Sequence, residues 1–188
     1  YGGGIAYINF RGLNEKLTFG MLFGEEKTWF LDFMDPWITG DHVSINLGMY
    51  NFFTDGAVYA YKYQEKGGYA GSGFYRGNRN KYDVKMGIET IFLDTAGVTT
   101  DDRWDLESFS FDYHYLYAVF NYQYDTRDVY IDPTKGQHLK LHMKPRFGIR
   151  NTHNYYQFKY EHTYFYQISQ NFKNPVFSIK SALFIQKP

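Results

Sequence analysis

The chain has 188 residues, which is the size of one domain, and its 20 basic and 20 acidic residues cancel to a formal net charge of zero. This balance argues against nucleic-acid binding, because proteins that bind nucleic acids are usually basic. The sequence contains no cysteine, so it cannot form a disulfide or a thiolate metal site. Aromatic residues make up 22% of the chain, yet its mean hydropathy is negative. Apolar and polar residues must therefore occupy separate places, and the aromatic content argues against a disordered chain.

The apolar residues follow the period of a β-strand. No run of about 18 apolar residues is present, so we expect no transmembrane helix. Apolar and polar residues instead alternate through most of the chain. The alternation predicts about ten strands, antiparallel if short turns join them, at residues 5–10, 16–23, 28–33, 43–50, 69–76, 82–92, 109–119, 138–144, 156–168 and 177–183.

Each predicted strand carries one apolar face. At 43–50 this face holds Val43, Ile45, Leu47 and Met49. At 82–92 it includes Tyr82, Val84, Met86, Ile88 and Phe92. At 109–119 the same alternation assigns Phe111, Tyr113, Tyr115, Tyr117 and Val119 to the apolar face, with Ser110, Asp112 and His114 opposite. Two architectures accommodate such strands, a soluble sandwich and a membrane barrel.

Three features favour an all-β, transmembrane, antiparallel up-and-down β-barrel over the sandwich. The strands are long, the face opposite the apolar one carries charges, and aromatic residues cluster near the strand ends. The charged side chains on the polar face include Lys85, Glu89, Lys140, Lys159 and Glu161. We expect the apolar face to contact lipid. The residues predicted to face lipid are Leu139, Leu141, Met143, Tyr156, Phe158, Tyr160 and Tyr164.

The connections between strands alternate between two groups. The shorter group comprises residues 11–16, 35–41, 77–80, 125–136 and 169–174. The other group comprises residues 24–27, 54–66, 94–107 and 150–154, of which 94–107 is the longest. In a bacterial outer membrane, the short turns of a barrel face the periplasm and the longer loops face outward.

No residue pattern indicates catalysis or a cofactor. His138 and His142 would lie about 13 Å apart along one strand, too far to share a metal ion. The acidic residues at 101–107 lack the spacing of an EF-hand, and neither a P-loop nor a serine nucleophile elbow is present. We therefore expect no enzyme activity, cofactor or metal. Arg127 and Asp128 could form an ion pair at the barrel rim or simply stabilise a turn.

Three turn motifs carry a resemblance to a known family. The run Asp125-Thr126-Arg127-Asp128, followed by Pro133-Thr134-Lys135-Gly136, resembles the Asp-Thr-Arg-Asp…Pro-Thr-x-Gly signature of the bacterial surface-antigen barrels, the BamA-type proteins. Residues 9–17 are similar to the family's Asn-x-x-Gly-x-Gly-x-x-Leu turn, and Asp35-Pro36-Trp37 resembles its Asp-Pro-Trp/Tyr turn. The periplasmic turn positions that match are Gly12, Asp35, Pro36, Asp125, Arg127, Asp128, Pro133 and Gly136.

The resemblance implies a sixteen-stranded barrel, of which this chain would hold about ten strands, the second to the eleventh. Residues 1–188 would then be a single, incomplete outer-membrane β-barrel domain without a soluble domain. A complete ten-stranded barrel is the competing interpretation, since ten is an allowed even number. The unpaired edges of an open ten-stranded sheet would be costly in lipid, so more chain, a partner or closure on itself would have to cover them.

The resemblance also implies a function in the bacterial outer membrane. BamA-type proteins assist the insertion, assembly or translocation of outer-membrane proteins, which implies contact with outer-membrane lipid, client β-barrel proteins and accessory lipoproteins. The alternative is a passive barrel, which would serve as a pore, an accessory barrel or the membrane anchor of a surface or lipase-type domain. The sequence leaves this choice open.

Overall fold

The computed structural model describes residues 1–24, 26–39, 42–55, 62–94, 110–150, 152–167 and 176–187. They form ten strands: β1 (Gly2–Phe10), β2 (Glu15–Leu22), β3 (Glu26–Asp35), β4 (Val43–Asp55), β5 (Lys62–Arg76), β6 (Asn80–Asp94), β7 (Ser110–Asp125), β8 (Gly136–Ile149), β9 (Tyr155–Gln167) and β10 (Val176–Lys187). Within these residues, no helix has the length and apolar character needed to cross a membrane.

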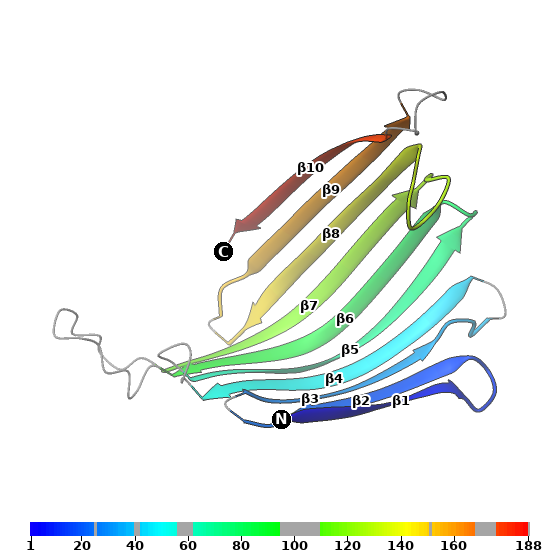
Figure 1. Cartoon of the computed structure of the whole chain (residues 1–188). Coiled ribbons are helices and arrows are strands. Elements are labelled where there is room, and N and C mark those ends of the chain that lie inside the picture. Colours follow the sequence, from blue (N-terminus) through cyan, green and yellow to red (C-terminus); the bar gives the residue numbers. More distant parts are fainter. Residues whose placement is uncertain are drawn as a thin grey trace.

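All ten strands belong to one antiparallel sheet whose spatial order is the chain order, from β1 to β10 (Figure 1). This up-and-down arrangement confirms the predicted ten strands, and it puts successive connections at alternate ends of the sheet. The strands have between 8 and 16 residues. β5 begins at Lys62, earlier than predicted, because glycines at 67 and 68 interrupt the alternation of side chains that reveals a strand.

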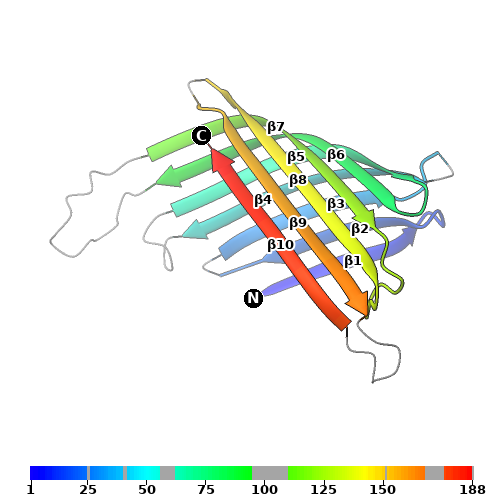
Figure 2. The same ribbon diagram turned by 90° about the horizontal axis from the view of Figure 1, so that it is seen from above.

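The sheet is curved and open. Figures 1 and 2 show that its two edge strands, β1 and β10, bend toward the same side and remain separate. Among the described strands, β1 pairs only with β2 and β10 only with β9. The chain therefore forms the wall of part of a barrel, and the closed ten-stranded alternative is wrong for this structure.

Contacts between strands that are not neighbours identify the concave face. The Tyr50 hydroxyl of β4 and the Lys144 ammonium of β8 both reach the carboxylate of Glu89 on β6. Curvature brings side chains of alternate strands together on its inside, so these contacts identify that face (Figure 1). Because side chains alternate along a strand, the pairing register then assigns every other residue to a face.

The register corrects one predicted face. In β7, Tyr115, Tyr117 and Val119 pair with Glu89, Gly87 and Lys85, which places them on the concave face. Tyr117 and Val119 are the two buried hydrophobic residues among those described. The convex face of this strand carries Asp112, His114, Leu116, Ala118 and Phe120 instead. The face predicted for this strand is therefore reversed throughout, Phe111 and Tyr113 included. For its tyrosines the prediction failed because a tyrosine has both an apolar ring and a polar hydroxyl, so alternation alone cannot assign its face.

Glycines on the concave face accommodate these tyrosine rings. The Tyr69 ring lies over Gly48 of the adjacent strand, where an added Cβ would be 2.6 Å from a ring carbon. Tyr117 lies over Gly87 in the same way, with its ring carbon 2.7 Å from such a Cβ. The missing glycine side chains thus let the rings lie flat against the sheet. This packing explains part of the high tyrosine content on a face that also carries charges.

Candidate functional site

A buried carboxylate lies at the centre of the concave face. The side chain of Glu89 on β6 has no solvent exposure, and two cations of β8 contact it. Lys144 Nζ is 2.9 Å from its Oε2, and Arg146 Nε is 2.6 Å from its Oε1. The two cations are two residues apart in one strand, so they share a face and reach across β7 to the same carboxylate.

Aromatic side chains enclose these charges. The Tyr50 hydroxyl lies 3.3 Å from both Glu89 and Glu65, and the Tyr63 hydroxyl donates to Glu65 at 2.6 Å. The Tyr117 ring packs under Lys144, whose Nζ is 4.5 Å from the ring centroid.

We call Glu65, Glu89, Lys144 and Arg146, with their tyrosines, the concave cluster. Its two carboxylates and two cations balance, and it links strands from β4 to β8. Because buried ions are costly unless they are paired, this arrangement stabilises one relative position of the strands. The sequence marked Glu89 as a polar-face residue but could not show its partners, which lie 55 and 57 positions further along the chain.

The turn between β7 and β8 contains most of the family motif. The Arg127 side chain donates two bonds to Asp125, from Nε to Oδ1 at 2.9 Å and from Nη2 to Oδ2 at 2.5 Å, and its backbone N–H donates a third to Oδ1 at 3.1 Å. Of the two alternatives for Arg127 and Asp128, the structure favours turn stabilisation over an ion pair between them, because the guanidinium binds Asp125 instead. Arg127 also donates to the backbone oxygen of Tyr130 and lies 4.7 Å from the centre of its ring.

Asp128 organises the rest of this turn. Its Oδ1 accepts backbone N–H groups from Val129 at 3.0 Å, Thr134 at 2.9 Å and Lys135 at 3.2 Å, and its Oδ2 accepts the Thr134 hydroxyl. These bonds favour the ionised carboxylate, and the Thr134 hydroxyl contributes most to holding the pKa of Asp128 below its ordinary value. Asp128 is thus a turn-stabilising residue.

Gly136 ends the turn in a conformation that requires glycine. Its φ is +104°, and an added Cβ would lie 2.9 Å from the Cα of Arg127. Pro133 lies three residues before it, in the segment that returns the chain to β8. The structure therefore assigns a local backbone role to the motif residues of this turn.

The other two motifs also form turns. Gly12 has φ +75° and donates its N–H to the Asn9 oxygen at 3.0 Å. Asn14 occupies the second glycine position of the family pattern and adopts φ +62°, a left-handed conformation that asparagine tolerates. At the β3–β4 turn, the carboxylate of Asp35 accepts the Trp37 N–H at 2.9 Å across Pro36.

All seven residues predicted to face lipid share the convex face. The cross-strand pairs Leu141–Tyr160 and Met143–Phe158 lie opposite the face of Lys140 and Lys144. By the same alternation, this face includes Leu139, Tyr156 and Tyr164. The structure thus groups these residues as expected, while their contact with lipid remains a prediction.

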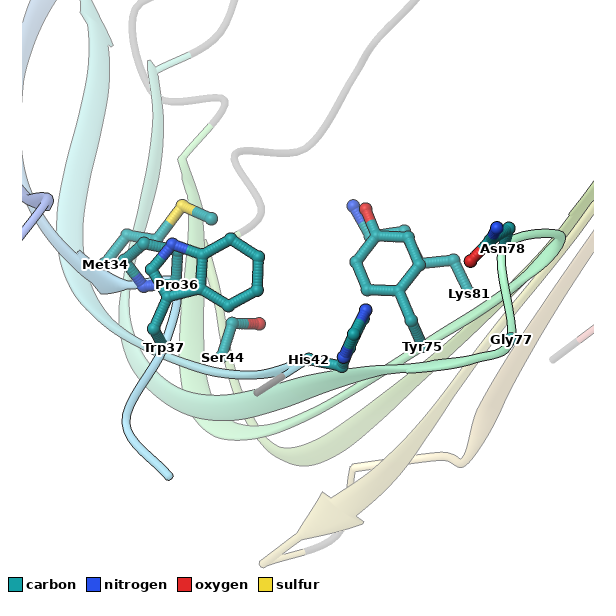
Figure 3. A pocket seen from close by; sticks show the side chains of 9 residues that line it. All are labelled: Met34, Pro36, Trp37, His42, Ser44, Tyr75, Gly77, Asn78 and Lys81. Atoms are coloured by element: carbon teal, nitrogen blue, oxygen red, sulfur yellow. The ribbon is translucent and has the colours of Figure 1, made fainter. Parts of the chain in front are cut away.

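A cavity of about 370 Å³ opens between the β3–β4 and β5–β6 turns. Figure 3 shows Trp37 on one side of it and Tyr75 and Lys81 on the other, with His42 between them. No residue pattern in the sequence indicated this cavity, because its walls come from two turns that only the sheet brings together.

No metal site is built by the part of the chain that the structure describes, since no group of three potential ligands comes together there. His138 and His142 both belong to β8 and lie on its concave face. The acidic segment at 101–107 lies outside the described residues.

Comparisons with known proteins agree with this fold. The model of the Omp85 superfamily domain matches residues 9–188. A solved structure, BamA from Haemophilus ducreyi lacking POTRA domains 1–3, aligns with 98% of this chain at a TM-score of 0.78 and 18% sequence identity. The chain spans 38% of that BamA chain. A search of the curated proteins found no match.

The match to the family model covers most of the chain. The structural match to BamA shows that the single antiparallel sheet of this chain corresponds to part of a larger barrel. The chain therefore belongs to the Omp85 superfamily, and its ten strands have the fold of part of a BamA-type outer-membrane β-barrel.

Proposed function

We propose that this chain is a barrel segment of an outer-membrane protein that assists the insertion, assembly or translocation of other outer-membrane proteins. The observation that carries the proposal is the Omp85 match over residues 9–188. The likeness of the sheet to BamA, at a TM-score of 0.78, supports it at the level of the fold.

The two faces of the sheet support a position in a membrane. The convex face exposes large apolar side chains such as Met86, Ile88 and Met143, which are 59%, 64% and 46% exposed. The concave face carries the concave cluster and its paired charges. A sheet with an apolar outer face and a polar inner face suits a barrel with lipid outside and a hydrated interior.

The free edges of the sheet also bear on the proposal. Because unpaired backbone groups are costly in lipid, β1 and β10 each require a further strand in the membrane. The coverage of 38% of the BamA chain is consistent with such additional strands. On the basis of the Omp85 match, the partners we propose are client β-barrel proteins, accessory lipoproteins and outer-membrane lipid.

Depletion of the protein in its native bacterium tests this function. If the protein assists assembly, folded forms of unrelated outer-membrane barrels, measured as heat-modifiable bands on gels of outer-membrane fractions, will fall. A strain depleted of one abundant porin is the matched control, because it loses a barrel without losing assembly.

Unchanged levels of folded barrels after depletion would contradict the assembly function and favour a passive barrel. The location is tested separately by fractionation. Recovery of the protein in the aqueous fraction without detergent would contradict its position in the outer membrane.

A further inference from the structure

The cavity between the β3–β4 and β5–β6 turns has exposed apolar walls that lipid contact does not explain. Met34 pairs with Asn46 on the concave face, and Tyr75 lies two residues beyond the concave-facing Gly73. Yet Met34 is 40% exposed, Trp37 45% and Tyr75 46%. Apolar side chains grouped around one opening on a polar face are typical of a binding site.

The aromatic rings form walls that suit a flat apolar group. The centroids of Trp37 and His42 are 6.1 Å apart with their planes at 83°, and those of His42 and Tyr75 are 6.3 Å apart at 68°. In Figure 3, His42 lies between the other two rings and leaves a space that Trp37 and Tyr75 flank. A volume of about 370 Å³ accommodates an aromatic side chain with part of its backbone.

Among the described lining residues, a lysine lies at the rim of the cavity. Lys81 Nζ lies 5.4 Å from the centre of the Tyr75 ring, which holds the ammonium beside the opening. Among the lining residues that the structure describes, Lys81 and His42 are basic and none carries a carboxylate. The charge therefore favours a group that is negative next to its apolar part.

We propose that this cavity binds a polypeptide segment that places an aromatic side chain beside an acidic one. The aromatic ring enters between Trp37 and Tyr75, and the carboxylate pairs with Lys81 at the rim. The choice of a polypeptide over a free small molecule rests on the proposed function, since a barrel that handles other proteins meets unfolded chain. The chemistry of the cavity itself is independent of that function.

Binding of short peptides to the purified protein in detergent micelles tests the proposal. The probes are acetyl-Phe-Asp-Gly-amide, its Phe-Asn counterpart and its Ala-Asp counterpart, with 3-phenylpropionate as a free aromatic acid. The readout is the ¹⁹F NMR resonance of 5-fluorotryptophan at position 37, assigned by Trp37→Phe. We expect a saturable shift with the Phe-Asp peptide, about fivefold weaker affinity for Phe-Asn, and no saturation with Ala-Asp.

Two variants assign the contacts. Lys81→Met is expected to abolish the preference for Phe-Asp over Phe-Asn while the aromatic contribution remains. Lys62→Met, an exposed lysine at the opposite end of β5, is the matched control and should keep the preference. Equal affinities for Phe-Asp and Phe-Asn in the unmodified protein, or an unchanged preference in Lys81→Met, would overturn the proposal.

The small-molecule probe separates the two sources of the ligand. If 3-phenylpropionate binds as tightly as the Phe-Asp peptide, the proposed polypeptide occupant is wrong. Because this measurement uses only the purified protein, it can fail while the depletion experiment succeeds, and the reverse also holds.

Discussion

Glu89 lies on the concave face of β6, and its neighbour Ile88 lies on the convex face. The Glu89 carboxylate is fully enclosed and contacts Lys144 and Arg146. Glu89 was predicted to lie on the polar face, but its burial and its ion pairs could not be read from its position in the sequence. Removing one member of a buried ion pair is far more costly than removing an exposed one, because the remaining charges stay buried without a partner.

The substitution Glu89→Gln is expected to lower the free energy of unfolding by about 3 kcal/mol. It leaves Lys144 and Arg146, whose side chains are 16% and 18% exposed, without their counter-charge. Urea unfolding of the refolded protein in lipid vesicles measures the effect.

The matched control is Glu161→Gln, because Glu161 pairs with Lys180 at 4.0 Å and their side chains are 48% and 62% exposed. An exposed pair of this kind contributes about 0–1 kcal/mol. Equal losses in the two variants would show that Glu89 does not behave as a buried ion.

Gly48 tests the packing of tyrosine rings over glycines. An alanine Cβ there would lie 2.5 Å from Cζ of Tyr69, whose hydroxyl donates to Asp32 and so limits the movement of the ring. We expect Gly48→Ala to cost about 1–3 kcal/mol in the same unfolding measurement. Gly68→Ala is the control, since its Cβ would meet only Gly48 O, at an ordinary 3.5 Å. A similar cost for both variants would contradict the packing.

At the scale of elements, the β7–β8 turn is organised by its own side chains. The Asp128 carboxylate accepts three backbone N–H groups of the turn. The Arg127 side chain binds Asp125, the last residue of β7, and so fixes the start of the turn. These bonds join residues at most seven positions apart, so the motif can specify the turn locally. This explains why the turn was recognisable in the sequence.

The pH dependence of this turn follows from the lowered pKa of Asp128. The folded pKa lies below the ordinary value of 3.8, chiefly because the Thr134 hydroxyl and backbone N–H groups bind the ionised form. Its contribution to turn stability is therefore complete above pH 3.8 and is lost as the pH falls through the lowered pKa. We expect the NMR amide shifts of Thr134 and Lys135 to stay constant between about pH 7 and 4 and to change only below that range.

Asp128→Asn should remove this titration and shift both amides at every pH. Asp132→Asn is the matched control, because Asp132 belongs to the same turn but accepts none of the bonds that Asp128 accepts. A titration of the Thr134 amide that persists in Asp128→Asn would assign the effect to another group.

At the scale of the whole molecule, curvature separates the two faces of the sheet. The concave face brings together side chains from strands that are not neighbours, as in the contact of Tyr50 with Glu89. The convex face spreads its side chains apart and leaves large apolar groups exposed. The polar concave side chains can therefore satisfy one another, whereas the convex ones require an apolar surrounding.

Arginine on the two faces of β8 is expected to have different costs. Met143 lies near the middle of the strand on the convex face and is 46% exposed. We expect Met143→Arg to lower the free energy of unfolding of the protein in the bilayer by about 2–4 kcal/mol. His142→Arg is the neighbouring control on the concave face, where the new side chain can still donate to Asn121, as His142 Nδ1 now contacts its Oδ1 at 2.7 Å. Equal costs in vesicle unfolding would contradict the lipid contact of the convex face.

The alternation of apolar and polar residues was sufficient to predict the strands, their order in the sheet and the face of most of their residues. The pairs Val43–Phe74 and Leu47–Ala70 connect strands that were predicted separately and in the observed order. The alternation failed for Tyr115 and Tyr117, since a tyrosine satisfies either face and the glycine beneath Tyr117 lies in another strand.

The sequence by itself determined the local features of this protein, which are the period-2 strands and the turn motifs at Gly12, Asp35 and Asp125–Gly136. Their physical causes act over a few residues, through side-chain alternation and hydrogen bonds within a turn. Only the tertiary structure decided the partners of Glu89, the cavity beside Trp37 and the open shape of the sheet. These depend on curvature and register, which bring together side chains far apart in the chain and are set by the pairing of all ten strands.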